Sequence, residues 1–178
     1  RRMLGLDTEP VAAPDRGDRR FKSPEWDNNP VFDVIRQSYL VTSRWLVDTM
    51  PLSPRASLLH NDWRLDNMAA SEHDPGVCVA VYDWDMCTQG DPLADLGTVM
   101  AVWYDEGEMP STLNPMPTTS PGFMNRDEAI GRYAEHASVD ARGLDWYVVF
   151  GTFKLAAVLQ QTYIRWLRGQ TRDERFAV

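Results

Sequence analysis

Apolar residues recur with the period of an α-helix after the Asn29-Pro30 pair, which offers a helix cap and a first-turn proline. The apolar positions are Phe32, Ile35, Tyr39, Leu40 and Leu46. This pattern predicts one long amphipathic helix that continues until Pro51.

Three further helices are predicted downstream. Asp91-Pro92 opens a helix that runs through Trp103, residues 125–128 (N-R-D-E) begin a helix through His136 in the manner of a capping box, and residues 143–168 form a mostly apolar terminal helix. The proline-rich stretch 110–121 is predicted to be a loop, which either shapes specificity or is a plain surface connection.

Two short strands are predicted between these helices. Residues 56–60 form a brief apolar run, and residues 76–83 form a run rich in valine that ends on an aspartate. Asp62 and Asp83 therefore both emerge near strand ends. A hairpin-like pairing of strands would bring Asn67 close to Asp83, and two such oxygen ligands suit magnesium.

The stretch 60–67 (H-N-D-W-R-L-D-N) has the spacing of the catalytic loop of protein kinases, in which an Asp accepts the substrate hydroxyl proton and an Asn holds magnesium. In that scheme a second Asp at a later strand end completes the metal site. By this spacing Asp62 is the candidate base, and Asn67 and Asp83 are the candidate magnesium ligands.

Residues from about 51 to 178 resemble the aminoglycoside phosphotransferase-like family of the kinase-like fold. The resemblance rests on residues 60–67, on residues 83–85 (D-W-D) and on residues 90–96 (G-D-P-L-A-D-L). Residues 144–156 further resemble the subgroup that is fused to acyl-CoA dehydrogenases, which hints at hydroxyacyl substrates.

The resemblance implies transfer of the ATP γ-phosphoryl group to a hydroxyl of a small molecule of aminoglycoside, sugar or hydroxyacyl type. It implies Asp62 as the base, Mg²⁺ and ATP bound through Asn67 and Asp83, and Arg64 as a cation near the transferred phosphoryl group. Asn61 stands where the family usually has glycine, and Asp85 where it usually has glutamate; both departures are mild, because asparagine tolerates unusual backbone angles and aspartate keeps the charge.

The nucleotide-binding lobe of a kinase-like enzyme is expected to be absent. Such a lobe needs a phosphate-covering loop and a strand lysine ahead of the catalytic loop. Before His60 the sequence has a single lysine, Lys22, and isolated glycines at Gly5 and Gly17, with no series of apolar strands. The predicted fold is therefore α+β and mainly helical, the C-terminal lobe of a protein-kinase-like fold with a short β-hairpin that carries the catalytic loop.

Residues from about 15 to 50 resemble the N-terminal region of polyhydroxyalkanoate synthases instead. Polymerase activity is not expected, because Cys78 and Cys87 lie outside the nucleophile-elbow pattern that the synthases use. The predicted organisation is a segment of residues 1–50, disordered through about residue 20 and then helical, followed by a phosphotransferase lobe of residues 51–178.

Charge agrees with a join near residue 50. The first 50 residues hold eight basic and eight acidic residues, so the whole net charge of −8 lies in the remainder. An acidic surface there would suit a cationic substrate or would simply be solvated, and it disfavours binding to nucleic acid. The cysteine spacing and the lack of a signal peptide or a membrane-length apolar run predict a cytoplasmic protein without a membrane span.

Several polar residues have structural interpretations. His60 is expected to hold the catalytic loop by hydrogen bonding, Asp91 to cap its helix, and Asp95 to brace the loop backbone. Two alternatives to an active phosphotransferase stay open. One is a lobe without turnover; the other is a binding module that uses residues 30–50 for self-association or to contact a second chain.

Overall fold

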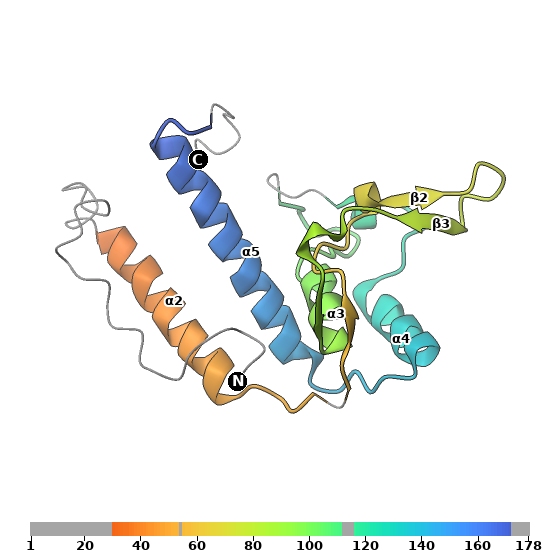
Figure 1. The fold of residues 1–178 in the computed structure, drawn as a ribbon, viewed down its shortest axis with the longest axis horizontal. Coiled ribbons are helices and arrows are strands. Elements are labelled where there is room, and N and C mark those ends of the chain that lie inside the picture. The colour runs from red at the N-terminus through yellow and green to blue at the C-terminus, as the bar shows by residue number, and fades with distance from the viewer. Residues whose placement is uncertain (1–29, 54, 112–115, 172–178) are drawn as a thin grey trace. The chain divides into compact units, whose positions relative to one another are not determined.

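The computed structural model describes residues 30–53, 55–111 and 116–171 (Figure 1). The chain divides into two compact units, residues 1–50 and residues 51–178. The predicted disordered start and the Asn29 cap lie outside the described residues.

The N-terminal unit contributes helix α2, Pro30–Asp48. The helix ends at Asp48, slightly before the predicted stop at Pro51. Its apolar side chains are unequally covered: Leu46 is buried, whereas Val34, Leu40 and Val41 are more than half exposed. The predicted helix is confirmed.

Three helices form the framework of the C-terminal unit, α3 (Pro92–Met100), α4 (Arg126–Ala137) and α5 (Leu144–Leu167). Asp91 caps α3 by accepting a hydrogen bond from the Leu93 N–H. Asn125 and Glu128 exchange both bonds of a capping box at the start of α4. The predicted helices are confirmed, although α3 ends at Met100 and not at Trp103.

Helices α3 and α5 pack against each other and enclose the buried core of this unit, which consists of Leu93, Leu96, Met100, Leu144 and Tyr147. Gly97 of α3 lies directly against the backbone of Tyr147, and Gly151 of α5 lies against the backbone of Thr98. The Tyr147 hydroxyl also donates a hydrogen bond of 2.8 Å to the Asp91 carboxylate. Burial raises the pKa of Tyr147 well above its ordinary value, and the hydrogen bond to Asp91 raises it further.

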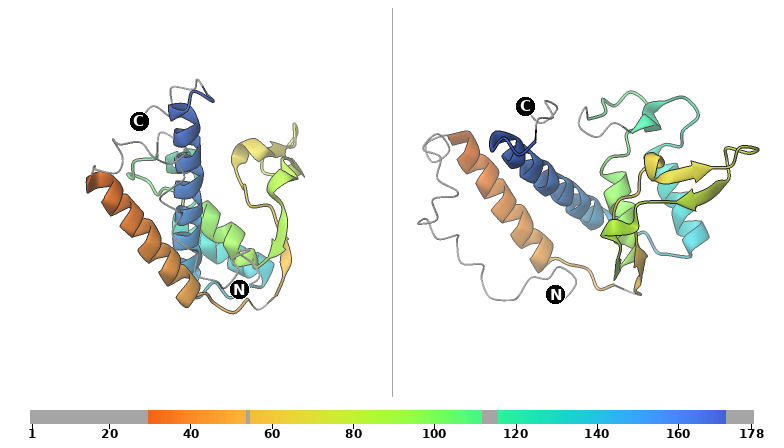
Figure 2. Two further views of the ribbon diagram at one scale, coloured as in Figure 1. Left: turned by 60° about the vertical axis from the view of Figure 1, so that its left-hand side comes forward. Right: turned by 45° about the horizontal axis from the view of Figure 1, so that its top comes forward.

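The strands make two small antiparallel sheets. Strand β1 (Ser57–Leu59) pairs with β4 (Thr88–Gly90), and β2 (Met68–Ala70) pairs with β3 (Cys78–Val81). The β2–β3 hairpin projects from the helices, as Figures 1 and 2 show. Both predicted strands are therefore present, but each pairs with a strand that the sequence pattern did not reveal.

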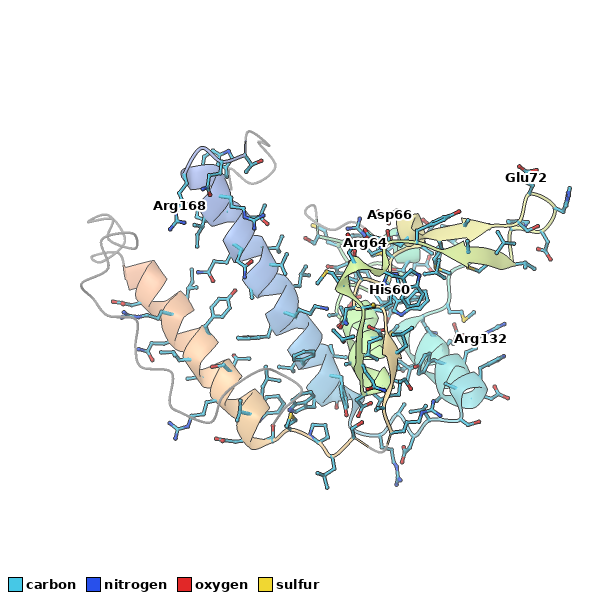
Figure 3. The ribbon with its side chains drawn as sticks, viewed as in Figure 1. His60, Arg64, Asp66, Glu72, Arg132 and Arg168 are labelled. Carbon is cyan, nitrogen blue, oxygen red and sulfur yellow. The ribbon has the colours of Figure 1, made fainter. Side chains whose placement is uncertain are left out.

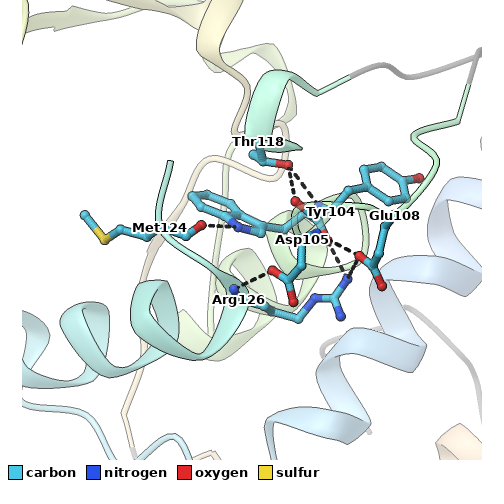
Figure 4. Close-up of polar contacts among 7 residues, drawn as sticks. Tyr104, Asp105, Glu108, Thr118, Met124 and Arg126 are labelled. Atoms are coloured by element: carbon cyan, nitrogen blue, oxygen red, sulfur yellow. Dashed lines mark hydrogen bonds and ion pairs between the residues drawn. The ribbon is translucent and has the colours of Figure 1, made fainter. Parts of the chain in front are cut away.

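The connection from α3 to α4 is a loop, as predicted, with one turn of 3-10 helix, η5 (Pro117–Thr119). Polar contacts hold its described parts together (Figure 4). The Thr118 hydroxyl bonds both the N–H and the carbonyl of Tyr104 at 2.9 Å, and Arg126 donates to the carbonyl of Trp103 and to the Glu108 carboxylate. These bonds tie the loop to the start of α4.

The described part of the chain is thus a mixed fold of helices with two small sheets, in agreement with the predicted α+β class. Before β1 its described residues contain one helix and no strand. None of the helices in the described ranges has the length and apolarity needed to cross a membrane.

Candidate functional site

The loop that follows β1 is held by one buried carboxylate on α3. Asp95 is 8% exposed and accepts hydrogen bonds from the backbone N–H of His60 at 2.7 Å, the backbone N–H of Asn61 at 2.8 Å and the Trp63 indole N–H at 2.9 Å. A buried carboxylate is stable only when its oxygens are satisfied, and bonds to a charged group contribute about 1.5–3 kcal/mol each. The predicted bracing role of Asp95 is confirmed.

His60 connects this loop to the end of strand β3. Its side chain is fully buried, Nε2 lies 2.7 Å from the carbonyl of Tyr82, and Nδ1 accepts a bond of 3.2 Å from the Asp62 N–H. These partners require the tautomer with the proton on Nε2. The imidazole ring also contacts the rings of Trp63 and Trp84, with centroid distances of 5.0 and 4.7 Å. His60 therefore holds the loop in place, as predicted.

Asn61 adopts the left-handed conformation, with φ of 67°. This backbone region is uncommon outside glycine but is tolerated by asparagine, so asparagine can stand where the sequences that this chain resembles usually have glycine. The Asn61 side-chain amide donates bonds of 2.9 Å to the Met86 carbonyl and to the Thr88 hydroxyl. The Asn61 backbone carbonyl accepts a bond of 2.8 Å from the Lys154 ammonium group. Sequence reasoning gave Lys154 no part in the site, although it is the single lysine after residue 50.

Asp62, the candidate base, is linked to Asn67 across the turn of the loop. The Asn67 side-chain nitrogen donates to the Asp62 backbone carbonyl at 2.8 Å and to the Asp62 carboxylate at 3.3 Å. Because the nitrogen makes both bonds, the amide oxygen of Asn67 is left available for another partner. The geometry thus brings these two candidate residues together.

The β2–β3 hairpin brings Asp83 to the same end of the structure as Asn67. Met68 pairs with Val81, and the Tyr82 N–H donates a bond of 2.8 Å to the carbonyl of Asn67. Asp83 follows at once in the left-handed conformation, with φ of 61° and ψ of 58°. Strained backbone of this kind costs about 1–3 kcal/mol and clusters at functional sites.

The Asp83 carboxylate has no hydrogen bond or ion pair to any residue in the described ranges, and the residue is exposed. Asn67 and Asp83 therefore offer an amide oxygen and a carboxylate, both hard ligands of the kind that Mg²⁺ takes. The described residues hold no cluster of three or more His, Cys, Asp or Glu side chains suited to a metal. This donor set fits magnesium, which keeps several waters and binds few protein ligands.

Arg64 lies at the surface of the loop and is paired within it. Its guanidinium donates a bond of 2.6 Å to the Asp66 carboxylate, with side-chain exposures of 40% and 66%. Figure 3 shows both residues beside the base of the hairpin, with His60 nearby. An exposed ion pair of this kind stabilises by at most about 1 kcal/mol, so an incoming anion can compete for Arg64.

A concavity of about 490 Å³ lies between α3, α4 and α5, and its lining includes Arg126, Asp127, Asp145 and Thr152. None of the candidate site residues lines it. The loop of residues 60–67 is bonded instead to residues 86 and 88 near β4, to Asp95 of α3 and to Lys154 of α5.

Comparison with known proteins shows which family and which fold this chain resembles. The sequence profile of the phosphotransferase enzyme family (APH) matches residues 5–147, so the match begins earlier than the resemblance over residues 51–178. The chain is 28% identical over 155 residues to acyl-CoA dehydrogenase family member 10 of Mus musculus. This alignment covers 85% of the present chain and 14% of the mouse protein. A 44-residue stretch, 25% of the chain, is 54% identical to 7% of the poly(3-hydroxyalkanoate) polymerase of Methylorubrum extorquens.

A crystal structure of a presumed aminoglycoside phosphotransferase from Ralstonia eutropha JMP134 has a similar fold. The TM-score is 0.65 at 23% identity, and the likeness covers 79% of this chain and 44% of that one. The chain therefore spans less than half of the solved relative and about one seventh of the mouse protein. With the family profile matched over most of its length and the kinase-like fold in common with a solved relative, the chain belongs to the phosphotransferase enzyme family.

Proposed function

We propose that this chain carries the acceptor-activating and metal-binding residues of an ATP-dependent small-molecule O-phosphotransferase. The observation that supports the proposal most directly is the arrangement around Asn67. Its amide nitrogen bonds Asp62, and its backbone carbonyl pairs with the residue that precedes Asp83. Asn67, itself a candidate metal ligand, thus links the candidate base to the strand end that carries the other candidate ligand, Asp83.

Asp62 is the proposed general base. A carboxylate in this position accepts the proton of the substrate hydroxyl as the oxygen attacks the γ-phosphorus. The donation from Asn67 orients the Asp62 carboxylate, and the brace through Asp95 holds the backbone on which it is carried. The chain's own contribution is therefore mostly positioning, which is the main requirement of phosphoryl transfer.

The amide oxygen of Asn67 and the carboxylate of Asp83 would hold Mg²⁺. When bound, the ion neutralises charge that develops on the ATP phosphates. Arg64 would supply a positive charge to the phosphoryl group. To do so, its guanidinium would release the Asp66 carboxylate and bond a phosphoryl oxygen in its place. Each of these groups is exposed or only partly buried, so each is accessible from solvent.

The groups that cover ATP are proposed to come from outside the described residues or from a second chain. Before β1 the described residues form the single helix α2 and no strand that could carry a phosphate-covering loop. The acceptor is proposed to be a hydroxyl compound of aminoglycoside, sugar or hydroxyacyl type, and the names of the acyl-CoA dehydrogenase relatives favour the last.

The metal assignment predicts how the chain responds to nucleotide. Magnesium-ATP should raise the melting temperature of the wild type, because a ligand at 100 times its Kd stabilises the folded state by about 2.7 kcal/mol. Asp83→Ala should lose most of this rise, since one of two protein ligands is removed. Differential scanning calorimetry with and without magnesium-ATP measures both.

Glu72→Ala is the matched control for this experiment. It removes one negative charge from the far end of the same hairpin (Figure 3) and should keep the full nucleotide response. If Asp83→Ala and the wild type respond equally, Asp83 is not a ligand. If the wild type itself does not respond, this chain alone does not bind the nucleotide.

A second candidate function is an interaction module formed by residues 30–50. Val34, Leu40 and Val41 expose 65%, 57% and 66% of their surfaces on α2, and apolar side chains exposed together favour association. The 44-residue match to poly(3-hydroxyalkanoate) polymerase gives this segment a different resemblance from the rest of the chain.

Self-association through α2 predicts a mass above that of the monomer in multi-angle light scattering. The double variant Leu40→Ser and Val41→Ser should return the chain to a monomer, because it removes two of the exposed apolar side chains. A wild-type chain that remains monomeric at high micromolar concentration would rule out self-association by this helix.

A further inference from the structure

The peptide group between Asn61 and Asp62 is held at both of its polar atoms. Its carbonyl, which belongs to Asn61, accepts a hydrogen bond of 2.8 Å from the Lys154 ammonium group. Its N–H, which belongs to Asp62, donates to His60 Nδ1 at 3.2 Å. A peptide plane fixed at both ends sets the direction in which the next side chain leaves the backbone, and that side chain is Asp62.

Asn61 would not hold this peptide in place by itself. Asparagine tolerates the left-handed conformation better than most residues, but this conformation alone does not fix the orientation of the peptide that follows it. The Asn61 N–H is bound to Asp95 and its side chain to Met86 and Thr88, so Lys154 satisfies the remaining backbone atom. Lys154 also approaches the Asn61 side-chain oxygen at 3.5 Å.

The Lys154 side chain is partly shielded from solvent and lies near carboxylates. The residue is half-buried on α5, 93 positions along the chain from its partner. Burial lowers the pKa of its ammonium group, while the carboxylates of Asp95 and Asp62 favour its charged form. A lysine that served only solubility would keep its ammonium group in water, since its long stem allows that at low cost.

We propose that Lys154 is a positioning residue that orients Asp62, by bonding the carbonyl of the peptide that precedes it from helix α5. The expected effect of Lys154 on turnover rests on the proposed function. Its effect on the orientation of the Asn61–Asp62 peptide does not. Lys154 links the helical framework to the loop that carries the base. Within the described residues, Arg64, the cation of the loop, bonds Asp66 and not this peptide.

The first test examines the backbone without any need for activity. In the 178-residue chain, Lys154→Met should speed hydrogen exchange of the Asp62 amide by about tenfold, because a hydrogen bond to a charged group contributes roughly 1.5 kcal/mol or more. Lys154→Arg, which retains a cationic donor, should restore part of the protection. Arg165→Met is the matched control, since it removes an exposed positive charge from the same helix and should leave the Asp62 amide unchanged.

The wild type provides an independent measurement should Lys154→Met fail to fold. The sequence contains two lysines, Lys22 and Lys154, so ¹⁵N-lysine labelling gives two side-chain ammonium signals at most. The signal that disappears in Lys154→Arg belongs to Lys154. A bonded ammonium group should exchange its protons slowly enough to be seen by NMR. A rapidly exchanging Lys154 ammonium, or unchanged exchange of the Asp62 amide in a folded Lys154→Met chain, would overturn the proposal.

The second test joins positioning to catalysis. With magnesium-ATP as the probe and ADP release as the readout, Lys154→Met should lower kcat about 100-fold while the KM for ATP changes little, because a displacement of about 1 Å can cost this much. Lys154→Arg should recover part of kcat. A wild type that releases no ADP would count against the proposed function, and the exchange experiment would still decide the role of Lys154.

Discussion

Gly97→Ala should destabilise the C-terminal unit by about 3 kcal/mol, at the upper end of the usual cost of overpacking. A Cβ at this position would lie 2.4 Å from the backbone carbonyl carbon of Tyr147 and 2.5 Å from its Cβ. Neither atom can yield as a flexible side chain would, so α3 and α5 must move apart. Thermal or urea unfolding, followed by circular dichroism, measures the loss.

Gly131→Ala provides the matched control for Gly97→Ala. Gly131 lies in α4, and an added Cβ there meets nothing within 4 Å. Because alanine favours a helix over glycine by about 1 kcal/mol, this variant should be slightly more stable than the wild type. If the two variants unfolded alike, the close approach of α3 to α5 would be wrong.

The separation of α3 from α5 in Gly97→Ala should also disturb the loop of residues 60–67. Asp95 precedes Gly97 by half a turn on α3 and braces His60 and Asn61, whereas Lys154 on α5 holds the carbonyl of Asn61. The loop is therefore bonded to both helices. If α3 and α5 move apart, Asp95 and Lys154 move relative to each other, so at least one of their bonds to the loop is lengthened.

Asp62→Ala should lower turnover of magnesium-ATP by about 1,000-fold, within the range that general-base catalysis contributes. The variant should fold like the wild type, because two of the bonds that residue 62 makes to the loop come from its backbone atoms. Its carbonyl keeps the 2.8 Å bond from Asn67, and its N–H keeps the bond to His60. Steady-state release of ADP, together with a thermal melt of each protein, checks both statements.

Magnesium-ATP binding separates the role of Asp62 from that of Asp83. Asp62→Ala should retain the rise in melting temperature that nucleotide produces, whereas Asp83→Ala should lose it. Glu72→Ala again serves as a control for the removed charge and should keep wild-type turnover. Residual turnover above a tenth of the wild-type rate in Asp62→Ala would remove Asp62 from the role of base.

Local signals in the sequence account for much of what could be anticipated. The capping box of Asn125 and Glu128 and the Asp91 cap involve residues two or three positions apart, so their spacing is visible in the chain itself. The left-handed conformation of Asn61 follows a known tolerance of asparagine. The spacing of Asp62, Asn67 and Asp83 likewise identified the residues that the structure brings together, although their chemical roles remain proposals.

Other features depended on partners far away in the chain. Strands β2 and β4 have three residues each, Met-Ala-Ala and Thr-Gln-Gly, and neither shows the alternation of a strand. They are strands because β3 and β1 offer hydrogen bonds to them. The pairing of β1 with β4, and of β2 with β3, was therefore decided by the tertiary structure.

Sequence by itself determined the helices, their caps and the family motifs, because each arises from residues within a few positions of one another. Tertiary structure alone decided that Lys154 would hold Asn61, that Tyr147 would bond Asp91, and that Gly97 would lie against the Tyr147 backbone. Lysine, tyrosine and glycine at these positions carry no local pattern that predicts such partners. Their roles depend on how closely α3 and α5 pack, which is set by the complementary surfaces of the whole helices and the contacts between them.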